Sequence, residues 1–219
     1  MDKLLRLRRL RSEEGMTLVE LTVSMSMMAV VAVIFLTALA SVQRGVERQT
    51  DRTTTNDQVR LAIDQLDHEI RSGNLLYDPQ NEADPDPSHE VVPYMSLRIY
   101  TQANADIRNP GNQCVQWRIT DIGELQSRRW ATNWRDDPPN LVTNFRIVAE
   151  NVVNRDPTVN VRAFTLDPDP AKGGRTIVVS LVVNSNSKSG QNVTIRQSVT
   201  GRNTEYGYPS NVCADIPPY

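Results

Sequence analysis

The sequence predicts an α+β protein in which a long N-terminal helix, apolar in its first half, packs on an antiparallel β-sheet. The run from Met16 to Val42 contains one charged residue and no proline or glycine. After residue 90, short segments alternate between apolar and polar residues and are separated by turn residues. The net charge of −2 over 219 residues gives no overall basic excess for binding nucleic acid.

Residues 1–15 form a basic leader. Besides Lys3 they contain four arginines, against three acidic residues, which gives a net charge of +2. The arginines are Arg6, Arg8, Arg9 and Arg11. Basic residues that flank an apolar span stay in the cytoplasm. We therefore expect the N-terminus inside and the chain beyond residue 42 outside the cytoplasmic membrane.

Three interpretations compete for the apolar segment 16–42. A cleaved secretory signal would have a shorter apolar stretch that ends at a small-residue cleavage site. A single-pass anchor fits the length, since about 20 residues span the hydrocarbon core, but it leaves the carboxylate of Glu20 unexplained. In the third interpretation, cleavage between Gly15 and Met16 creates an α-amino group. In a bundle of staggered helices that amine can pair with Glu20 of a neighbouring subunit and fix the register.

The segment from Gly15 to Glu20 (GMTLVE), with its basic leader and apolar continuation, resembles the prepilin peptidase site of type IV pilins and type II secretion pseudopilins. The resemblance implies a type IV pilin-like fold, cleavage after Gly15, N-methylation of Met16, and Glu20 as the assembly residue. Met16 departs from the family, which more often has phenylalanine there. Glu20 argues against the K-type tip pseudopilin, which usually lacks this glutamate.

The helix is expected to continue to residue 72, with its part 43–72 amphipathic. Val59, Ile63, Leu66 and Ile70 follow one another at steps of four, three and four residues, which forms one apolar face. A β-sheet from the rest of the chain is the available partner for that face. Residues 49–58 contain no aliphatic or aromatic residue, which is typical of a solvated helix surface or of a flexible neck. We expect residues 73–90 to form an acidic, proline-rich loop.

Residues 91–219 are expected to form an extracytoplasmic, β-rich head. The segments that predict strands centre on residues 95–99, 115–119, 141–147, 159–161, 177–183 and 193–199, and the run 177–183 suggests a central strand. The helix end at 66–71, the segment 115–119, the stretch from Gly123 to Arg129 and the end at 201–203 loosely resemble J-type minor pseudopilins and PilW-like minor pilins. The tail after residue 203 is not placed by this pattern.

Cys114 and Cys213 are the only cysteines, and their spacing fits no zinc-binding pattern. They form either a disulfide or two inert buried thiols, and a position outside the membrane favours the disulfide. His68 and His89 are the only histidines, and we expect both on the solvated surface. Without a nucleophile motif or a phosphate-binding loop, the sequence does not predict an enzyme, a cofactor or a metal centre.

Two binding hypotheses compete with simpler interpretations. Oxygen-bearing side chains of the acidic loops could bind calcium, or the loops could simply be solvated; these residues are Asp78, Asn81, Glu82, Asp84, Asp86, Asp167 and Asp169. Aromatic residues interleaved with arginines could stack on DNA, or they could belong to the core; they are Tyr100, Trp117, Trp130 and Trp134, with Arg118, Arg128, Arg129 and Arg135.

The expected function is that of a minor pilin or pseudopilin, a structural subunit of a type IV pilus or of a type II secretion-like pseudopilus. Its expected partners are the prepilin peptidase, other pilin subunits and the cytoplasmic membrane, which it crosses once before it enters the filament. The same signal would suit surface pili, protein secretion or DNA uptake. The alternative is an uncleaved, single-pass binding module whose β-rich ectodomain captures a ligand or DNA.

Overall fold

The computed structural model describes residues 17–82, 92–101, 111, 113–169, 174–184, 192–201 and 208–217, apart from the side chains of residues 48, 51 and 52. The chain divides into two compact units, Met1–Glu47 and Arg48–Tyr219. We describe each unit by itself. The helix α1, Leu18–Arg71, belongs to both. It confirms the helix expected over residues 16–72.

The first unit contains the apolar part of α1. Leu18–Glu47 has a mean hydropathy of 2.3 and is long and apolar enough to cross a membrane. A signal sequence would pass the same test of length and composition. Large apolar side chains point outward all around this part, for example Phe35 with 66% of its surface exposed. A helix that is apolar on every side requires an apolar surrounding, either lipid or other helices.

The middle of α1 has no buried side. Gly45 does not interrupt the helix, and every described side chain from Gly45 to Thr54 is exposed. The hydroxyl of Thr53 donates a hydrogen bond to the backbone oxygen of Gln49, at 2.9 Å. Thr55, 5% exposed, is the first buried residue after this stretch.

In the second unit, the amphipathic part of α1 packs on the sheets as its periodicity predicts. Val59, Ile63, Leu66 and Ile70 are at most 5% exposed. They share one core cluster with apolar residues from both β-sheets, among them the fully buried Trp117. The packing of α1 on antiparallel sheets establishes the α+β fold class and explains why this half of the helix is stable in water.

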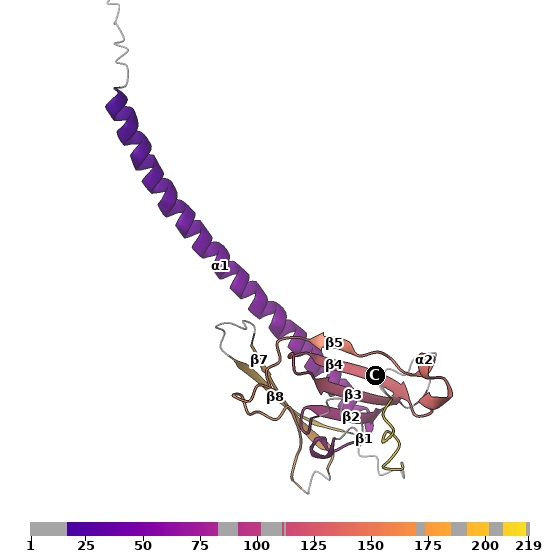
Figure 1. Cartoon of the computed structure of the whole chain (residues 1–219). Coiled ribbons are helices and arrows are strands. Elements are labelled where there is room, and N and C mark those ends of the chain that lie inside the picture. The colour runs from indigo at the N-terminus through magenta and orange to yellow at the C-terminus, as the bar shows by residue number, and fades with distance from the viewer. Residues whose placement is uncertain are drawn as a thin grey trace, which may run out of the picture. The chain divides into compact units, whose positions relative to one another are not determined.

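Five antiparallel strands form the larger sheet, in the order β1-β2-β3-β4-β5, and lie side by side in Figure 1. Their bounds are Gly73–Leu76, Ser96–Thr101, Gln113–Ile119, Leu125–Ala131 and Arg146–Ala149. Three antiparallel strands form the smaller sheet, in the order β6-β7-β8. These strands are Phe164–Leu166, Thr176–Val183 and Val193–Thr200. The central position expected for the run 177–183 is confirmed by β7.

The expectation of a loop over residues 73–90 is wrong in its first part. Gly73 ends α1 as expected, but the chain then enters β1, which places Leu76 opposite Ile99 of β2. Two leucines after the helix end provide apolar side chains for the sheet edge, which outweighs the loop signal of the residues that follow. A short 3₁₀ helix, Pro79–Asn81, comes next, and residues 83–91 lie outside the described part of the chain.

The strand expected around Val159 and Val161 is also wrong. This stretch forms turns, with Asn160 in the left-handed region at φ 47°. The carboxylate of Asp156 accepts a hydrogen bond from the backbone N–H of Thr158 at 2.8 Å, and this local bond competes with strand pairing. The strand β6 begins at Phe164 instead.

Between β4 and β5 the chain forms a 3₁₀ helix, Trp134–Asp136, and the short helix α2, Pro138–Leu141. Leu141, expected to begin a strand, therefore ends a helix. The turn expected at Gly123 is confirmed between β3 and β4, with φ +83°. A Cβ on Gly123 would lie 2.9 Å from the backbone oxygen of Val152, so both the backbone angle and the space require glycine.

A second, smaller core covers the other face of the five-stranded sheet. Tyr100, Cys114 and Trp130 are cross-strand neighbours on β2, β3 and β4, so their side chains point to the same face. They pack with Trp134 and with Cys213 from the C-terminal tail. The tail that the sequence left unplaced therefore completes this second core.

Candidate functional site

The N-terminal processing residues expected from the sequence lie mostly outside the described residues, which begin at Thr17. This applies to Gly15 and Met16 and to Arg6, Arg8, Arg9 and Arg11. Thr17 caps α1: its hydroxyl oxygen accepts the backbone N–H of Glu20 at 3.2 Å, and its carbonyl accepts that of Leu21 at 3.0 Å. Thr17 and Glu20 have the spacing of a capping box, a signal that the sequence analysis missed.

The side chain of Glu20 is exposed and contacts no charged group within the described part of the chain. An acidic residue in the first turn is stabilised by the helix dipole, typically by about 0.3–1 kcal/mol. Glu20 therefore has a local role at the start of α1. That role does not require an acid within an otherwise apolar surface, because Thr17 already caps the helix.

The disulfide between Cys114 and Cys213 is confirmed. It joins β3 to the C-terminal tail, with the two Cα atoms 5.7 Å apart, and both residues are fully buried. Disulfides persist in oxidising compartments, so the bond suggests that the second unit lies outside the cytoplasm.

A buried ion pair fastens the same tail to the sheet. Nε of Arg98 on β2 donates to both carboxylate oxygens of Glu82, each at 2.9 Å. Nη1 of Arg98 donates to the backbone oxygen of Cys213 at 2.9 Å, and the backbone N–H of Cys213 donates to the hydroxyl of Tyr77 at 2.9 Å. The guanidinium group also lies over the Tyr77 ring, 4.9 Å from its centre. The disulfide is thus one of several bonds that hold the tail.

Burial raises the pKa of Glu82, and the neighbouring Arg98 opposes that rise. Because the folded-state pKa lies above the unfolded value, ionisation of Glu82 opposes folding. The protonated side chain of Glu82 contributes its full stabilisation below the unfolded pKa of about 4.3. This stabilisation is lost as the pH rises through the folded pKa. Burial likewise raises the pKa of the Tyr77 hydroxyl.

We therefore expect the wild-type protein to lose unfolding free energy relative to Glu82→Gln as the pH rises from about 4 towards 7. Glutamine cannot ionise, so the difference between the two proteins isolates this group from the other carboxylates. Urea unfolding of both proteins at a series of pH values measures it. A difference that grows in favour of the wild type over that range would show that the pKa of Glu82 is lowered instead.

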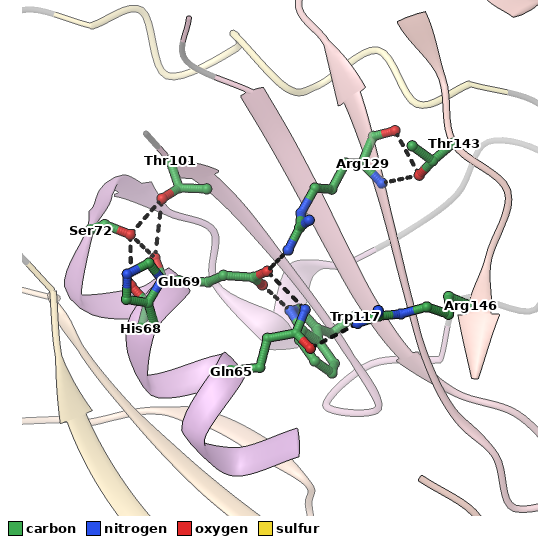
Figure 2. Close-up of polar contacts among 9 residues, drawn as sticks. All are labelled: Gln65, His68, Glu69, Ser72, Thr101, Trp117, Arg129, Thr143 and Arg146. Atoms are coloured by element: carbon green, nitrogen blue, oxygen red, sulfur yellow. Dashed lines mark hydrogen bonds and ion pairs between the residues drawn. The ribbon is translucent and has the colours of Figure 1, made fainter. Parts of the chain in front are cut away.

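A second buried carboxylate, Glu69 of α1, joins the helix to the five-stranded sheet (Figure 2). Nε1 of Trp117 on β3 donates to Oε2 of Glu69 at 2.5 Å, and Nη2 of Arg129 on β4 pairs with Oε1. Nε2 of Gln65, one helical turn earlier, donates to the same Oε1 at 3.3 Å. The hydroxyl of Thr101 donates to the backbone oxygen of Glu69 at 3.3 Å.

An open cleft of about 500 Å³ lies beside this network. Gln65, His68, Arg129 and Arg146 line it, and Figure 2 shows Arg146 reaching Gln65 from β5. Nη2 of Arg146 donates to Oε1 of Gln65 at 2.9 Å. The sequence analysis missed this site. The available signal was Glu69 itself, which stands three residues after Leu66 and beside Ile70 on the apolar face.

The aromatic residues of the DNA hypothesis belong to the cores, and its arginines have partners within the head. Trp117, Trp130, Trp134 and Tyr100 are at most 8% exposed, so these four rings offer no stacking surface for bases. Arg129 pairs with Glu69, and Arg135 pairs with Asp215 of the tail at 2.6 Å. The guanidinium groups of Arg118 and Arg128 lie 3.8 and 4.5 Å from the centre of the Phe145 ring.

The residues of the calcium hypothesis have other partners where they are described. Glu82 binds Arg98, and the Asp78 carboxylate accepts the backbone N–H of Gln80 at 3.0 Å. Asp84, Asp86 and His89 lie outside the described residues. Within the described ranges, no three His, Cys, Asp or Glu side chains come together as a metal site would require. His68 is exposed, as expected.

Comparisons with known proteins do not place the chain in a family. No protein-family model, no curated protein and no solved structure matches it. The architecture alone is consistent with a pilin-like protein: a long helix with an apolar first part and a second part packed on antiparallel sheet. The specific assignment therefore depends on the N-terminal residues and their chemistry.

Proposed function

We propose that the chain is a minor pilin or pseudopilin, a structural subunit of a type IV pilus or a type II secretion-like pseudopilus, processed by the prepilin peptidase after Gly15. One observation carries the proposal. The acidic residue Glu20 lies in the first turn of an exposed apolar helix, and this helix follows a Gly-Met junction that is preceded by basic residues.

The chemistry of Glu20 supports assembly through this helix. Cleavage would give Met16 a positively charged α-amino group four residues from Glu20, about 6 Å along a helix axis. In a staggered bundle, this amine and the Glu20 of a neighbour can neutralise each other where neither could remain alone. The outward-facing apolar side chains of Leu18–Glu47 would cover one another in such a bundle.

A location follows from this function, and the chain is expected to have a structural role. The leader stays inside, α1 crosses the cytoplasmic membrane once, and the disulfide-bonded head lies outside before the subunit enters the filament. The covalent steps, cleavage after Gly15 and methylation of Met16, are carried out on this protein by the peptidase.

Mass spectrometry of the mature N-terminus tests the processing step. We expect the protein recovered from cells to begin at Met16 and to carry one additional methyl group on its α-amine. A protein that retains residues 1–15 would instead be the single-pass membrane-anchored binding module of the alternative hypothesis.

Replacing Glu20 by alanine or by glutamine tests the assembly step. We expect both variants to be inserted and cleaved but to enter filaments about tenfold less well, equivalent to about 1.4 kcal/mol, because the charge that pairs with the neighbouring amine is lost. Quantitative immunoblotting of purified filaments measures the incorporation. Glu47→Gln, a charge change near the other end of the apolar segment, is the control; a Glu20→Gln protein that incorporates like this control would contradict the role of the charge.

A further inference from the structure

We propose that the cleft lined by Gln65, His68, Arg129 and Arg146 binds an aspartate or glutamate side chain of a neighbouring protein subunit. The inference rests on the proposed function, because it requires the chain to assemble with other subunits. It assigns a second contact, in the head, that is independent of Glu20 and of the apolar part of α1.

The balance of charge in the cleft favours an anion. Glu69 is fully buried and pairs with Arg129, so these two charges compensate each other. Arg146 is exposed, and among the described residues the one hydrogen-bond acceptor of its guanidinium group is the neutral amide oxygen of Gln65. Arg129, Arg146 and Glu69 together therefore carry a net charge of +1.

Gln65 holds that charge in place without cancelling it. Its Oε1 accepts from Arg146 at 2.9 Å, while its Nε2 donates to the buried Glu69 at 3.3 Å. The amide is therefore fixed at both ends, and it fixes the guanidinium group in turn. Within the described part of the chain, Nη2 is the one guanidinium nitrogen of Arg146 that is engaged, so the other N–H groups can form the two parallel hydrogen bonds that a carboxylate accepts.

The acids of α1 itself do not occupy the cleft. Asp67 is engaged by Nε of Arg71 at 2.6 Å and by Nε2 of Gln197 at 2.9 Å. Asp64, exposed beside Gln65, forms no ion pair within the described part of the chain. No acidic side chain is among the described residues that line the cleft, so we expect the anion to come from another molecule.

The surroundings favour a protein side chain over a small hydrated anion. The cleft, at about 500 Å³, is much larger than one carboxylate group. Leu61 lies one helical turn before Gln65 on the same side of α1 and is 68% exposed. An exposed leucine one helical turn from the residue that holds the cation fits an acidic residue that is followed or preceded by an apolar residue on a partner surface.

Charge reversal tests the proposal in filaments assembled from the full chain. We expect Arg146→Glu to lower incorporation about tenfold, because it places two acids opposite each other. Arg60→Glu is the matched control: Arg60 is exposed on α1 and forms no hydrogen bond or ion pair with another described side chain, so we expect less than a twofold change. Both proteins should still be cleaved after Gly15 and form the disulfide. Equal incorporation of the two variants would overturn the inference.

Cross-linking identifies the source of the carboxylate. Arg146→Lys keeps the charge and adds an amine that a water-soluble carbodiimide joins directly to a carboxylate in contact with it. In filaments, we expect peptide mass spectrometry to find residue 146 joined to an aspartate or glutamate of another subunit, with no such product at position 60 in Arg60→Lys. Products joined only to acids of the same chain would overturn the inference.

These outcomes separate the inference from the proposed function. If wild-type protein keeps its leader and never enters filaments, the proposed function fails first. If wild-type and Arg146→Glu proteins are both processed and enter filaments equally, the proposed function stands and only the acid-binding cleft is rejected.

Discussion

Glu69→Ala is expected to lower the free energy of unfolding of the head by about 3–5 kcal/mol, the range measured when one partner of a buried ion pair is removed. The carboxylate is fully buried and accepts from Trp117 and Gln65 besides pairing with Arg129. Without it, the indole N–H and the largely buried guanidinium group lose their acceptor in an interior that excludes water. The helix would also lose its polar connection to β3 and β4.

Urea unfolding of the full chain in a non-ionic detergent measures this effect. All three tryptophans belong to the second unit, so their fluorescence reports on the head alone. Asp64→Ala, at an exposed position on the same helix, is the control and should change stability by less than about 0.5 kcal/mol. A double-mutant cycle with Arg129→Ala gives the energy of the pair itself. A loss for Glu69→Ala no larger than that of the control would show that the buried network does not stabilise the fold.

The double variant Cys114→Ala/Cys213→Ala is expected to lose about 4–5 kcal/mol of unfolding free energy. The bond closes a loop of 99 residues, and the chain-entropy model gives about 4.7 kcal/mol for a loop of this length. The effect comes mainly from the unfolded chain, which gains freedom when the bond is absent. The C-terminal tail should still dock in part, because Arg98 and Tyr77 bind the backbone of Cys213 and do not require its sulfur.

The two contributions can be separated by limited proteolysis. In the cysteine-free protein we expect the tail to be cleaved faster than in the wild type, and faster again when Arg98→Ala is added. Reducing agent should act on the wild type only when urea opens the head, because both cysteines are fully buried. A bond that is reduced readily under native conditions, or a cysteine-free protein as stable as the wild type, would contradict this account.

Local periodicity predicted much of this fold. The steps of four, three and four residues from Val59 to Ile70 defined the buried face of α1, because a helix must place such residues on one side. The run that became β7 was apolar at nearly every position and therefore had to be central. The pattern failed where a local hydrogen bond or a left-handed backbone conformation decided the structure, as at Asp156 and Asn160 respectively.

Of the candidate sites, one could be predicted from the sequence and one could not. The disulfide could be expected because the chain has only two cysteines. The network of Glu69 could not, since its partners Trp117 and Arg129 stand 48 and 60 residues away in sequence, and only the folded sheet brings them to the helix. The strand β4 was not expected, for a related reason. Arg128 and Arg129 interrupt the apolar alternation in the sequence, and only the folded head shows that the first stacks on Phe145 and the second pairs with Glu69.

If the chain is the filament subunit proposed above, the exposed stretch of α1 from Gly45 to Thr54 has a mechanical consequence, because such a subunit is anchored at one end and pulled at the other. Side chains there have no core to hold them, and a glycine and several β-branched threonines favour the helix least. Under tension these turns would open before the part that is packed in the head. A residue contributes about 1.5 Å of length in a helix and about 3.3 Å in an extended chain. The stretch would therefore lengthen under load while the anchor and the head stay folded.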